Sequence, residues 1–356
     1  MRYVSFERTG RISRIGLGTW QFGASEWGYG EQYAEQGARV IVRRALELGV
    51  TLFDTAESYS SGRSERILGR ALGDARERVF LATKVMPLVP SALVIEQRAL
   101  ASADRLGVRT LPLYQVHRPN PVAHDVGVMR GMRLLQRVGL VGEIGVSNYS
   151  LARWRSAERA LGGRVLSNQV RYNLLAREPE DELLPYAEAR RRLVIAYSPL
   201  AQGLLSGRYG PDRRPGNRVR AGHPTFRPEN LDRTAGLVAT VRDVAAAYDA
   251  TPAQVALAWV LRRPAVVAIA GASGVGQLEE NVAAADLDLA DDACAVLDAA
   301  SDRLREEESP SARRRPLAEA RNWARAARHV ARTARHDRLL DRDDAPARDG
   351  PGSPTL

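Results

Sequence analysis

The chain has 356 residues, of which 44% are hydrophobic, and its formal net charge is +10. This length accommodates one large α/β domain or two ordinary domains. No apolar run approaches the roughly 20 residues that a membrane-spanning helix needs, so we expect no transmembrane segment. Basic residues are mostly mixed with acidic ones and show no interleaving with aromatic residues, so we expect no nucleic-acid partner.

The single cysteine, Cys294, cannot form an internal disulfide, which is typical of a protein from a reducing compartment. The first residues lack the apolar stretch of a secretion signal, and we therefore expect a cytoplasmic protein. Of the 52 lysine and arginine residues, all but one are arginine. The exception is Lys84, and its retention in an arginine-biased chain marks it as a candidate functional residue.

A small hairpin and eight further strands are predicted in chain order. Residues 3–6 and 11–13 flank Thr9 and Gly10, which are typical of a tight turn. Short β-rich segments then alternate with amphipathic ones. The predicted strands cover residues 15–19, 51–55, 79–84, 113–115, 143–146, 167–169, 194–197 and 266–270. The predicted helices cover residues 39–48, 64–72, 91–106, 126–138, 150–161, 181–191, 230–248 with 252–261, and 277–285.

Eight consecutive βα units predict an α/β fold, a closed parallel (β/α)8 or TIM barrel with an N-terminal β-hairpin cap, over residues 1–305. A doubly wound open sheet is the competing fold. It would need a glycine-rich phosphate loop after the first strand, where this chain has Thr19-Trp20-Gln21-Phe22-Gly23. Two long loops are predicted at residues 20–36 and 203–228. Both follow strands and should lie at the carboxyl end of the barrel, where barrel active sites form.

Residues 306–356 are expected to form a basic helical extension with a disordered tail. A helix rich in alanine and arginine is predicted over residues 317–340, and residues 341–356 are predicted to be disordered. The arginines of this helix are Arg321, Arg325, Arg328, Arg332 and Arg335. Two interpretations remain open, a contact with an anionic partner and a solvated, loosely docked helix.

Four polar residues fall at or just beyond the ends of three consecutive predicted strands. Asp54, Lys84 and His117 end the second, third and fourth strands, and Tyr59 follows Asp54 by five positions. Consecutive strands of a barrel are neighbours, so these side chains can converge at its carboxyl end. Neither a metal-ligand spacing nor a serine or cysteine nucleophile motif accompanies them. We therefore expect acid/base chemistry at this point and no metal.

A tyrosine can act as a proton donor here if its neighbours tune it. Free tyrosine has a pKa near 10, and the adjacent ammonium of Lys84 would lower the pKa of Tyr59 by favouring the phenolate. Asp54 would hold Lys84 charged and in place. His117 would donate a hydrogen bond to a substrate carbonyl, Tyr59 would supply a proton, and a cofactor would supply hydride.

The motifs that carry these residues resemble those of the aldo-keto reductase superfamily over roughly residues 11–300. They include Gly16-Leu-Gly-Thr-Trp20, Phe53-Asp-Thr-Ala-Glu-Ser-Tyr59, Gly62-Arg-Ser-Glu65, Gln115-Val-His117, Gly145-Val-Ser-Asn148 and Asn168-Gln-Val-Arg-Tyr-Asn173. The resemblance is to bacterial members similar to potassium-channel β subunits and inositol-operon-type reductases. It implies a catalytic tetrad of Asp54, Tyr59, Lys84 and His117.

The resemblance also implies that the cofactor is NADPH. Three residues would hold the nicotinamide carboxamide, Tyr197 would stack on its ring, and Arg220 would reach the 2′-phosphate with help from Arg208. The implied cofactor-binding residues are Thr19, Trp20, Asp54, Ser147, Asn148, Gln169, Tyr197, Ser198, Pro199, Leu200, Ala201, Gly203, Arg208, Arg220, Gly271, Ser273, Gln277, Glu280 and Asn281. Ser147, Asn148 and Gln169 are the carboxamide residues, and the last four residues would hold the adenosine end.

The expected function is NADPH-dependent reduction of an aldehyde or ketone to an alcohol, with a small carbonyl compound as the substrate. One alternative is a nucleotide-sensing regulatory subunit similar to channel β subunits. His117 favours the enzyme, because those subunits often replace this histidine. A second alternative is a biosynthetic ketoreductase that acts on a sugar or polyketide.

Overall fold

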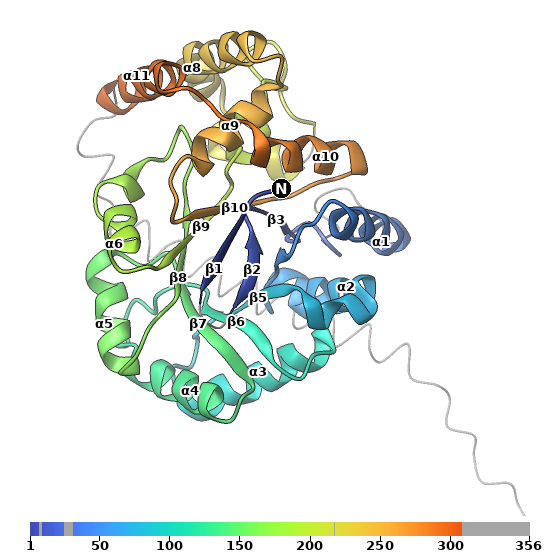
Figure 1. Ribbon diagram of the computed structural model, residues 1–356, viewed down its shortest axis with the longest axis vertical. Helices are drawn as coiled ribbons and strands as arrows, with labels where there is room; N and C mark the ends of the chain where they lie inside the picture. Colours follow the sequence, from blue (N-terminus) through green and yellow to red (C-terminus); the bar gives the residue numbers. More distant parts are fainter. Residues whose placement is uncertain (7–8, 25–30, 217, 308–356) are drawn as a thin grey trace, which may run out of the picture.

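The computed structural model describes residues 1–6, 9–24, 31–216 and 218–307, and it shows eight parallel strands closed into a barrel (Figure 1). Each strand pairs with the next in sequence, and the last strand pairs with the first. The strands are β3 Ile15–Gly18, β4 Leu52–Asp54, β5 Phe80–Val85, β6 Leu111–Val116, β7 Val141–Ser147, β8 Ser167–Arg171, β9 Leu193–Tyr197 and β10 Val266–Ala270. The predicted TIM barrel is therefore confirmed.

Helices surround the barrel and cover its outer face (Figure 1). Those described are α1 Glu31–Glu47, α2 Arg63–Leu72, α3 Ala92–Leu106, α4 Val126–Arg137, α5 Leu151–Leu161, α6 Leu183–Ala189, α7 Arg218–Ala221, α8 Pro228–Ala247, α9 Pro252–Leu261, α10 Val275–Ala283 and α11 Asp291–Glu307. Their apolar sides pack on the strands to form the larger hydrophobic core.

Two loop predictions need correction. The helix predicted at residues 39–48 begins at Glu31, so most of the second half of the predicted loop 20–36 is helical. The apolar repeat that marked this helix begins only at Val40, whereas the preceding turns are rich in Glu and Gln, which favour helix without leaving a pattern. The predicted loop 203–228 also contains short helical segments, namely α7, most of η5 Ala201–Ser206 and η6 Pro224–Phe226.

The predicted N-terminal hairpin is formed by β1 Tyr3–Phe6 and β2 Gly10–Ser13, which pair antiparallel. Ile12 is fully buried in the inner core of the barrel, together with Leu52 and Leu193, the first residues of β4 and β9. The backbone N–H of Thr51 donates to Ser13 Oγ over 3.0 Å. The hairpin thus closes the amino end of the barrel, which leaves the carboxyl end for a site.

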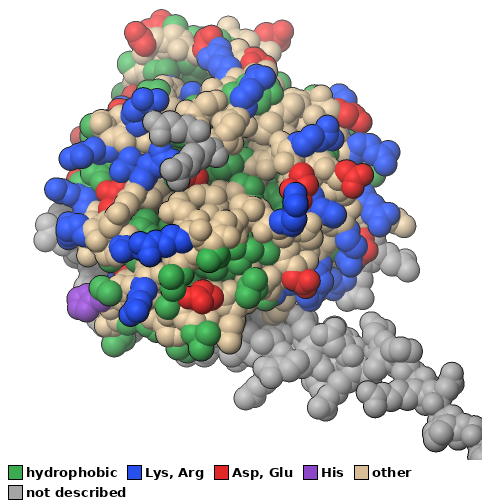
Figure 2. All heavy atoms as spheres, turned by 60° about the horizontal axis from the view of Figure 1, so that its bottom comes forward, with side chains coloured by type: hydrophobic (Ala, Val, Ile, Leu, Met, Phe, Trp, Pro, Cys, Tyr) green, Lys and Arg blue, Asp and Glu red, His purple; other side chains and the backbone are tan. Residues whose placement is uncertain are grey.

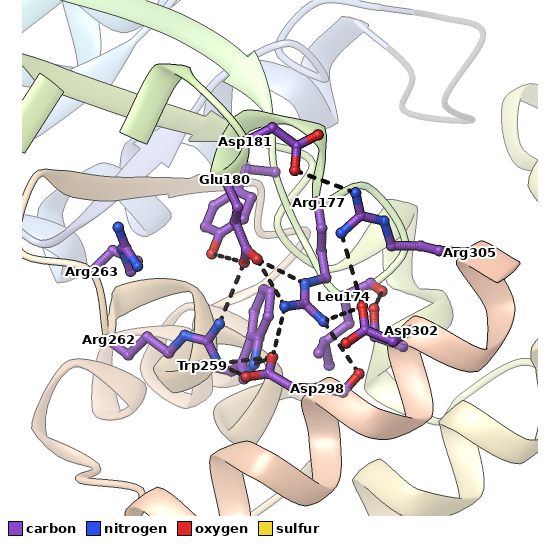
Figure 3. A network of polar contacts seen from close by, with 12 residues as sticks. Leu174, Arg177, Glu180, Asp181, Trp259, Arg262, Arg263, Asp298, Asp302 and Arg305 are labelled. Atoms are coloured by element: carbon purple, nitrogen blue, oxygen red, sulfur yellow. Dashed lines mark hydrogen bonds and ion pairs between the residues drawn. The ribbon is translucent and has the colours of Figure 1, made fainter. Parts of the chain in front are cut away.

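Helix α11 is joined to the barrel by a partly buried network of ion pairs (Figure 3). Arg177 follows β8 and is only 7% exposed. Its Nη2 atom lies 2.8 Å from Glu180 Oε2 and 3.3 Å from Oδ1 of Asp298 in α11. Arg262, next to α9, lies 2.8 Å from Asp298, and Trp259 Nε1 donates to the same carboxylate over 3.0 Å. The buried guanidinium of Arg177 needs such partners, and Asp298 supplies one of them, so α11 is an integral part of the barrel domain.

Arginine side chains are scattered over the face shown in Figure 2, with acidic side chains among them. Large hydrophobic side chains are exposed along α3 and α4, including Leu93, Leu100, Val126 and, directly after α4, Val138. In the described part of the chain, no helix has the length and apolar character to cross a membrane. The predicted helix 317–340 and tail 341–356 lie outside the described residues.

Candidate active site

The carboxyl ends of β4, β5 and β6 bring the four predicted acid/base residues together. Asp54 is the last residue of β4, Lys84 lies one residue before the end of β5, and His117 directly follows β6. Tyr59 begins the short 3-10 helix η2 Tyr59–Gly62 in the connection after β4. The convergence follows from the barrel, because neighbouring parallel strands end side by side.

Lys84 lies at the centre of this group. Its Nζ donates to Asp54 Oδ1 over 2.6 Å, to the backbone oxygen of Thr55 over 2.7 Å and to the Tyr59 hydroxyl oxygen over 3.1 Å. Lys84 is fully buried, and Asp54 is 1% exposed. An ammonium has three donor protons, and all three have acceptors here. The buried charge is therefore fully satisfied, and it fixes the position of the Tyr59 hydroxyl.

The pKa of Tyr59 lies above its ordinary value, because burial raises it more than the Lys84 ammonium lowers it. The predicted influence of Lys84 is present, but the net shift is opposite to the one expected from the sequence. Burial also raises the pKa of Asp54 against the attraction of Lys84. Burial alone would lower the pKa of Lys84, but Asp54 and Tyr59 together raise it. At neutral pH Tyr59 consequently holds its proton and Lys84 is charged.

His117 packs beside Tyr59, with the two rings edge to face and their centroids 5.7 Å apart. Its Nδ1 lies 3.1 Å from Ser58 Oγ. Burial lowers the pKa of His117 well below its ordinary value, and the nearby Lys84 adds to this effect. His117 is therefore a neutral imidazole at pH 7, which carries one N–H and one lone pair.

The residues predicted to hold the nicotinamide form a chain of hydrogen bonds beside this group. Gln169 Nε2 donates to Asp54 Oδ2 over 2.7 Å, and Ser147 Oγ donates to the backbone oxygen of Gln169 over 2.8 Å. Asn148 Nδ2 donates to Ser147 Oγ, and the Tyr197 hydroxyl donates to Asn148 Oδ1, both over 2.9 Å. These residues from β7, β8 and β9 are thus continuous with the acid/base group.

Strained backbone is concentrated around the same place. Six of the eight non-glycine residues with positive φ in the described part of the chain follow β4, β7 or β9 at this end: Ser60, Ser61, Asn148, Ser198, Ala201 and Gln202. Left-handed conformations of such residues persist only where the surroundings impose them, and they gather at functional sites. Asn173 Nδ2 donates to the backbone oxygen of Ser198 over 2.8 Å and so helps to hold one of these turns.

A pocket lies between the segment after β9 and helix α10. It is lined by Leu200, Gly203, Ser206, Arg208, Tyr209, Arg220, Ala253, Gln277, Glu280 and Asn281. Seven of these ten residues were predicted to bind the cofactor. Asn281 Oδ1 is buried without a hydrogen-bond partner, so it can accept a hydrogen bond from a bound ligand. Two arginines and a buried free acceptor suit the phosphates and the base of a nucleotide.

Two further predicted cofactor-binding residues lie near the acid/base group. Thr19 is buried after β3, and its hydroxyl donates to the backbone oxygen of Asp54 over 2.9 Å. Trp20 is 45% exposed, and its ring centroid lies 6.4 Å from that of Tyr59. Thr19 therefore supports the end of β4, whereas Trp20 presents an aromatic face beside the tyrosine.

The remaining predicted cofactor-binding residues lie beyond β9 and β10. Residues 198–201 directly follow β9, and Gly271 directly follows β10. A Cβ atom at Gly271 would approach the Gln21 side chain to 3.2 Å, so glycine allows close packing there. The Ser273 hydroxyl donates to Gln277 Oε1 over 3.0 Å. This contact occupies an oxygen of a residue that lines the pocket.

Three polar residues close to the group were not identified from the sequence as site residues. Ser58 Oγ lies 3.1 Å from His117 Nδ1. Glu65 is fully buried. Glu57 accepts from the backbone N–H of Met86 over 2.6 Å and from two nitrogens of Arg98, each over 2.8 Å. The signal that could have identified them is their position within the Phe53–Tyr59 and Gly62–Glu65 motifs.

The comparisons with known proteins identify the family. The model of the Aldo/keto reductase family matches residues 14–302. The chain belongs to this family. An aldo-keto reductase reduces carbonyl groups, so the chain is an NAD(P)H-dependent oxidoreductase. In the ranges that the structure describes, no group of three or more His, Cys, Asp or Glu residues is arranged to hold a metal ion.

Individual members of the family share most of the chain. It is 58% identical over 289 residues to the uncharacterized oxidoreductase Rv2298 of Mycobacterium tuberculosis. The matched residues cover 81% of this chain and 89% of the relative. It is 32% identical over 308 residues to the NADH-specific methylglyoxal reductase of Escherichia coli, covering 79% of this chain and 92% of the relative. An aldo/keto reductase of Klebsiella pneumoniae, solved with NADP and acetate, has a TM-score of 0.68 and 28% identity over 83% of this chain and 94% of its own.

Proposed function

We propose that this aldo-keto reductase reduces an aldehyde or ketone to an alcohol with NADPH, and that Tyr59 is the general acid. The observation that carries the proposal is the buried contact of Lys84 Nζ with both Asp54 and the Tyr59 hydroxyl. This contact places a protonated phenol next to a fixed positive charge, at the end of the barrel where active sites form.

Four residues carry the proposed chemistry. Tyr59 and His117 each donate a hydrogen bond to the oxygen of the substrate carbonyl. A nicotinamide held by Ser147, Asn148 and Gln169 would supply hydride to the carbonyl carbon. The electron pair of the C=O bond moves onto the oxygen, and Tyr59 transfers its hydroxyl proton there to complete the alcohol. Lys84, held by Asp54, stabilises the resulting phenolate until water returns a proton to it.

The cofactor would lie across the carboxyl ends of β7 to β10. Ser147, Asn148 and Gln169 supply amide and hydroxyl groups for the nicotinamide carboxamide, and the Tyr197 ring supplies an aromatic face. The pocket beside α10 would take the phosphates and the adenosine. The unpaired, buried Asn281 Oδ1 supports a ligand with an N–H group at that end.

NADPH is proposed rather than NADH because Arg208 and Arg220 both line this pocket. A guanidinium can make a bidentate contact with a 2′-phosphate, which NADH lacks. The Klebsiella pneumoniae structure contains NADP, whereas the Escherichia coli relative is named as NADH-specific. The two arginines favour the NADP precedent for this chain.

We propose small, reactive carbonyl compounds as substrates, on the precedent of the relative named as a methylglyoxal reductase. A regulatory subunit that only senses nucleotides would not need a neutral histidine beside the tyrosine, so His117 supports an enzyme. We assign this activity to residues 1–305 and treat residues 306–356 as an extension outside the site.

A panel of carbonyl compounds tests the proposal with each cofactor. Methylglyoxal, aromatic aldehydes, simple ketones and a sugar aldehyde are mixed with enzyme and NADPH or NADH, and the loss of reduced cofactor is followed by absorbance. We expect turnover of at least one aldehyde, with kcat/KM higher for NADPH by about tenfold or more, which corresponds to roughly one charge-assisted contact. Tight binding of NADPH without turnover of any carbonyl would instead indicate a regulatory subunit.

A further inference from the structure

The ring of His117 has one hydrogen-bond partner among the described residues, and that partner is Ser58. His117 Nδ1 lies 3.1 Å from Ser58 Oγ. The backbone of His117 is held separately, because its N–H donates to the Val85 oxygen over 2.8 Å and its own oxygen accepts from Asn148 Nδ2 over 3.2 Å. The backbone contacts place the residue and the Tyr59 ring packs against the imidazole, whereas Ser58 supplies the hydrogen bond to the ring.

Ser58 is itself firmly placed. It directly precedes η2 at the position of a helix cap, yet its side chain makes no capping hydrogen bond. Its neighbours on both sides are anchored, Glu57 by Met86 and Arg98 and Tyr59 by Lys84. The hydroxyl is therefore held near His117 and is not used to stabilise its own helix.

The neutral ring of His117 can carry its proton on either nitrogen. Burial and the nearby Lys84 keep the imidazole uncharged near pH 7, so only one N–H is available. A serine hydroxyl can donate to Nδ1, in which case Nε2 carries the proton. It can also accept from Nδ1–H, and Nε2 then presents a lone pair. Only the first arrangement offers a donor to a carbonyl oxygen, because two lone pairs repel each other.

We propose that Ser58 is a positioning residue. Its hydroxyl donates a hydrogen bond to His117 Nδ1, and the ring therefore presents Nε2–H to the carbonyl oxygen of the substrate. This inference rests on the proposed function, because it assumes a carbonyl ligand. It assigns to Ser58 the choice of tautomer, which a histidine ring takes from the hydrogen bond at its other nitrogen.

The tautomer can be measured directly by nitrogen NMR of protein labelled with 15N-histidine. The chain contains five histidines, and the His117→Asn variant identifies the signals of His117. In the wild-type protein we expect a proton on Nε2 and an Nδ1 resonance shifted by an accepted hydrogen bond. In Ser58→Ala the Nδ1 resonance should move to the position of a nitrogen without such a bond, and Ser58→Thr should restore it.

Turnover is measured on the same variants with the best carbonyl substrate of the panel. We expect kcat/KM for the carbonyl to fall about tenfold or more in Ser58→Ala, the effect of losing one well-placed hydrogen bond, while the Kd for NADPH stays unchanged. Ser58→Thr should retain most of the activity. Ser61→Ala is the matched control, because it removes a hydroxyl from the same turn. The Ser61 Oγ atom is buried without a hydrogen bond.

Three results would overturn the inference. These are a proton on Nδ1 in the wild-type protein, an Nδ1 resonance unmoved in Ser58→Ala, or a moved resonance with unchanged kcat/KM. A fall in activity without a change in the NMR signal points to a general structural role and counts against it as well. If the wild-type protein reduces no carbonyl compound, the proposed function fails, and the NMR result still decides whether Ser58 sets the tautomer.

Discussion

Gln169 Nε2 lies 2.7 Å from Asp54 Oδ2, on the carboxylate oxygen that Lys84 does not contact. Both oxygens of this buried carboxylate are therefore held, one by the ammonium and one by an amide from β8. The contact joins the acid/base group to the residues proposed to hold the nicotinamide. A bound cofactor that displaces Gln169 would remove this hydrogen bond from Asp54 and so alter the contact between Asp54 and Lys84.

Lys84→Arg should lose at least about 10²-fold in kcat. The Nζ atom makes three contacts of 2.6 to 3.1 Å in a fully buried position, and a planar guanidinium cannot reproduce them without moving Tyr59. The larger side chain should also cost about 1–3 kcal/mol of stability through overpacking. Single-turnover rates and thermal melts measure the two effects.

Lys84→Met is the matched variant for this prediction, because it keeps an unbranched chain of similar length without the charge. It should lose activity, and it should also lose stability, because Asp54 is then buried without its cationic partner. A Lys84→Arg enzyme with wild-type kcat would show that positive charge alone is sufficient and that the geometry around Lys84 is unimportant.

Arg220→Ala should lower kcat/KM with NADPH by about tenfold or more and leave kcat/KM with NADH nearly unchanged. The reason is that Arg220 lines the pocket proposed for the 2′-phosphate, which only NADPH carries. Arg213→Ala is the control, since Arg213 is exposed in the same segment. Equal losses with the two cofactors would place Arg220 away from the 2′-phosphate.

The rate of reduction should depend little on pH near neutrality. The pKa of Tyr59 is raised above about 10 and the pKa of His117 is lowered well below about 6.5, so Tyr59 stays protonated and His117 stays neutral between about pH 6 and pH 8. The single-turnover rate should therefore change by less than about threefold over this range. A rate that falls with rising pH to a midpoint near neutrality would mean that Lys84 outweighs burial at Tyr59.

Deletion of residues 308–356 should leave the melting temperature and kcat nearly unchanged. The barrel domain already includes α11, which is tied to it by Arg177 and Asp298. Asp298→Ala in the full chain should by contrast destabilise the protein by about 1–3 kcal/mol, because it removes a partly buried partner of two arginines and of Trp259. A large loss of stability on deleting residues 308–356 would show that the extension packs on the barrel.

The barrel was predictable because short strand-like segments alternate with amphipathic segments along the chain. The start of α1 was not, because its first turns carry helix-forming polar residues without an apolar repeat before Val40. A repeat of apolar positions reports the side of a helix that packs on the barrel. It says nothing about turns that extend beyond that contact.

The acid/base residues were predictable because a strand end fixes both their place and their direction in a barrel. The partners of these residues were not. The contact of Glu57 with Arg98 spans 41 positions and depends on how α3 packs. The sign of the pKa shift at Tyr59 was also beyond the sequence, since it depends on how strongly burial opposes the charge of Lys84.

The central claim is that Tyr59 supplies the proton, and Tyr59→Phe tests it most directly. The variant keeps the ring that packs against His117 and removes only the hydroxyl that contacts Lys84. We measure single-turnover reduction of the best aldehyde with saturating NADPH, together with the Kd for NADPH. The account predicts unchanged cofactor binding and a rate lower by at least about 10²-fold, the contribution of a positioned general acid. A Tyr59→Phe enzyme that reduces the aldehyde at the wild-type rate would contradict it.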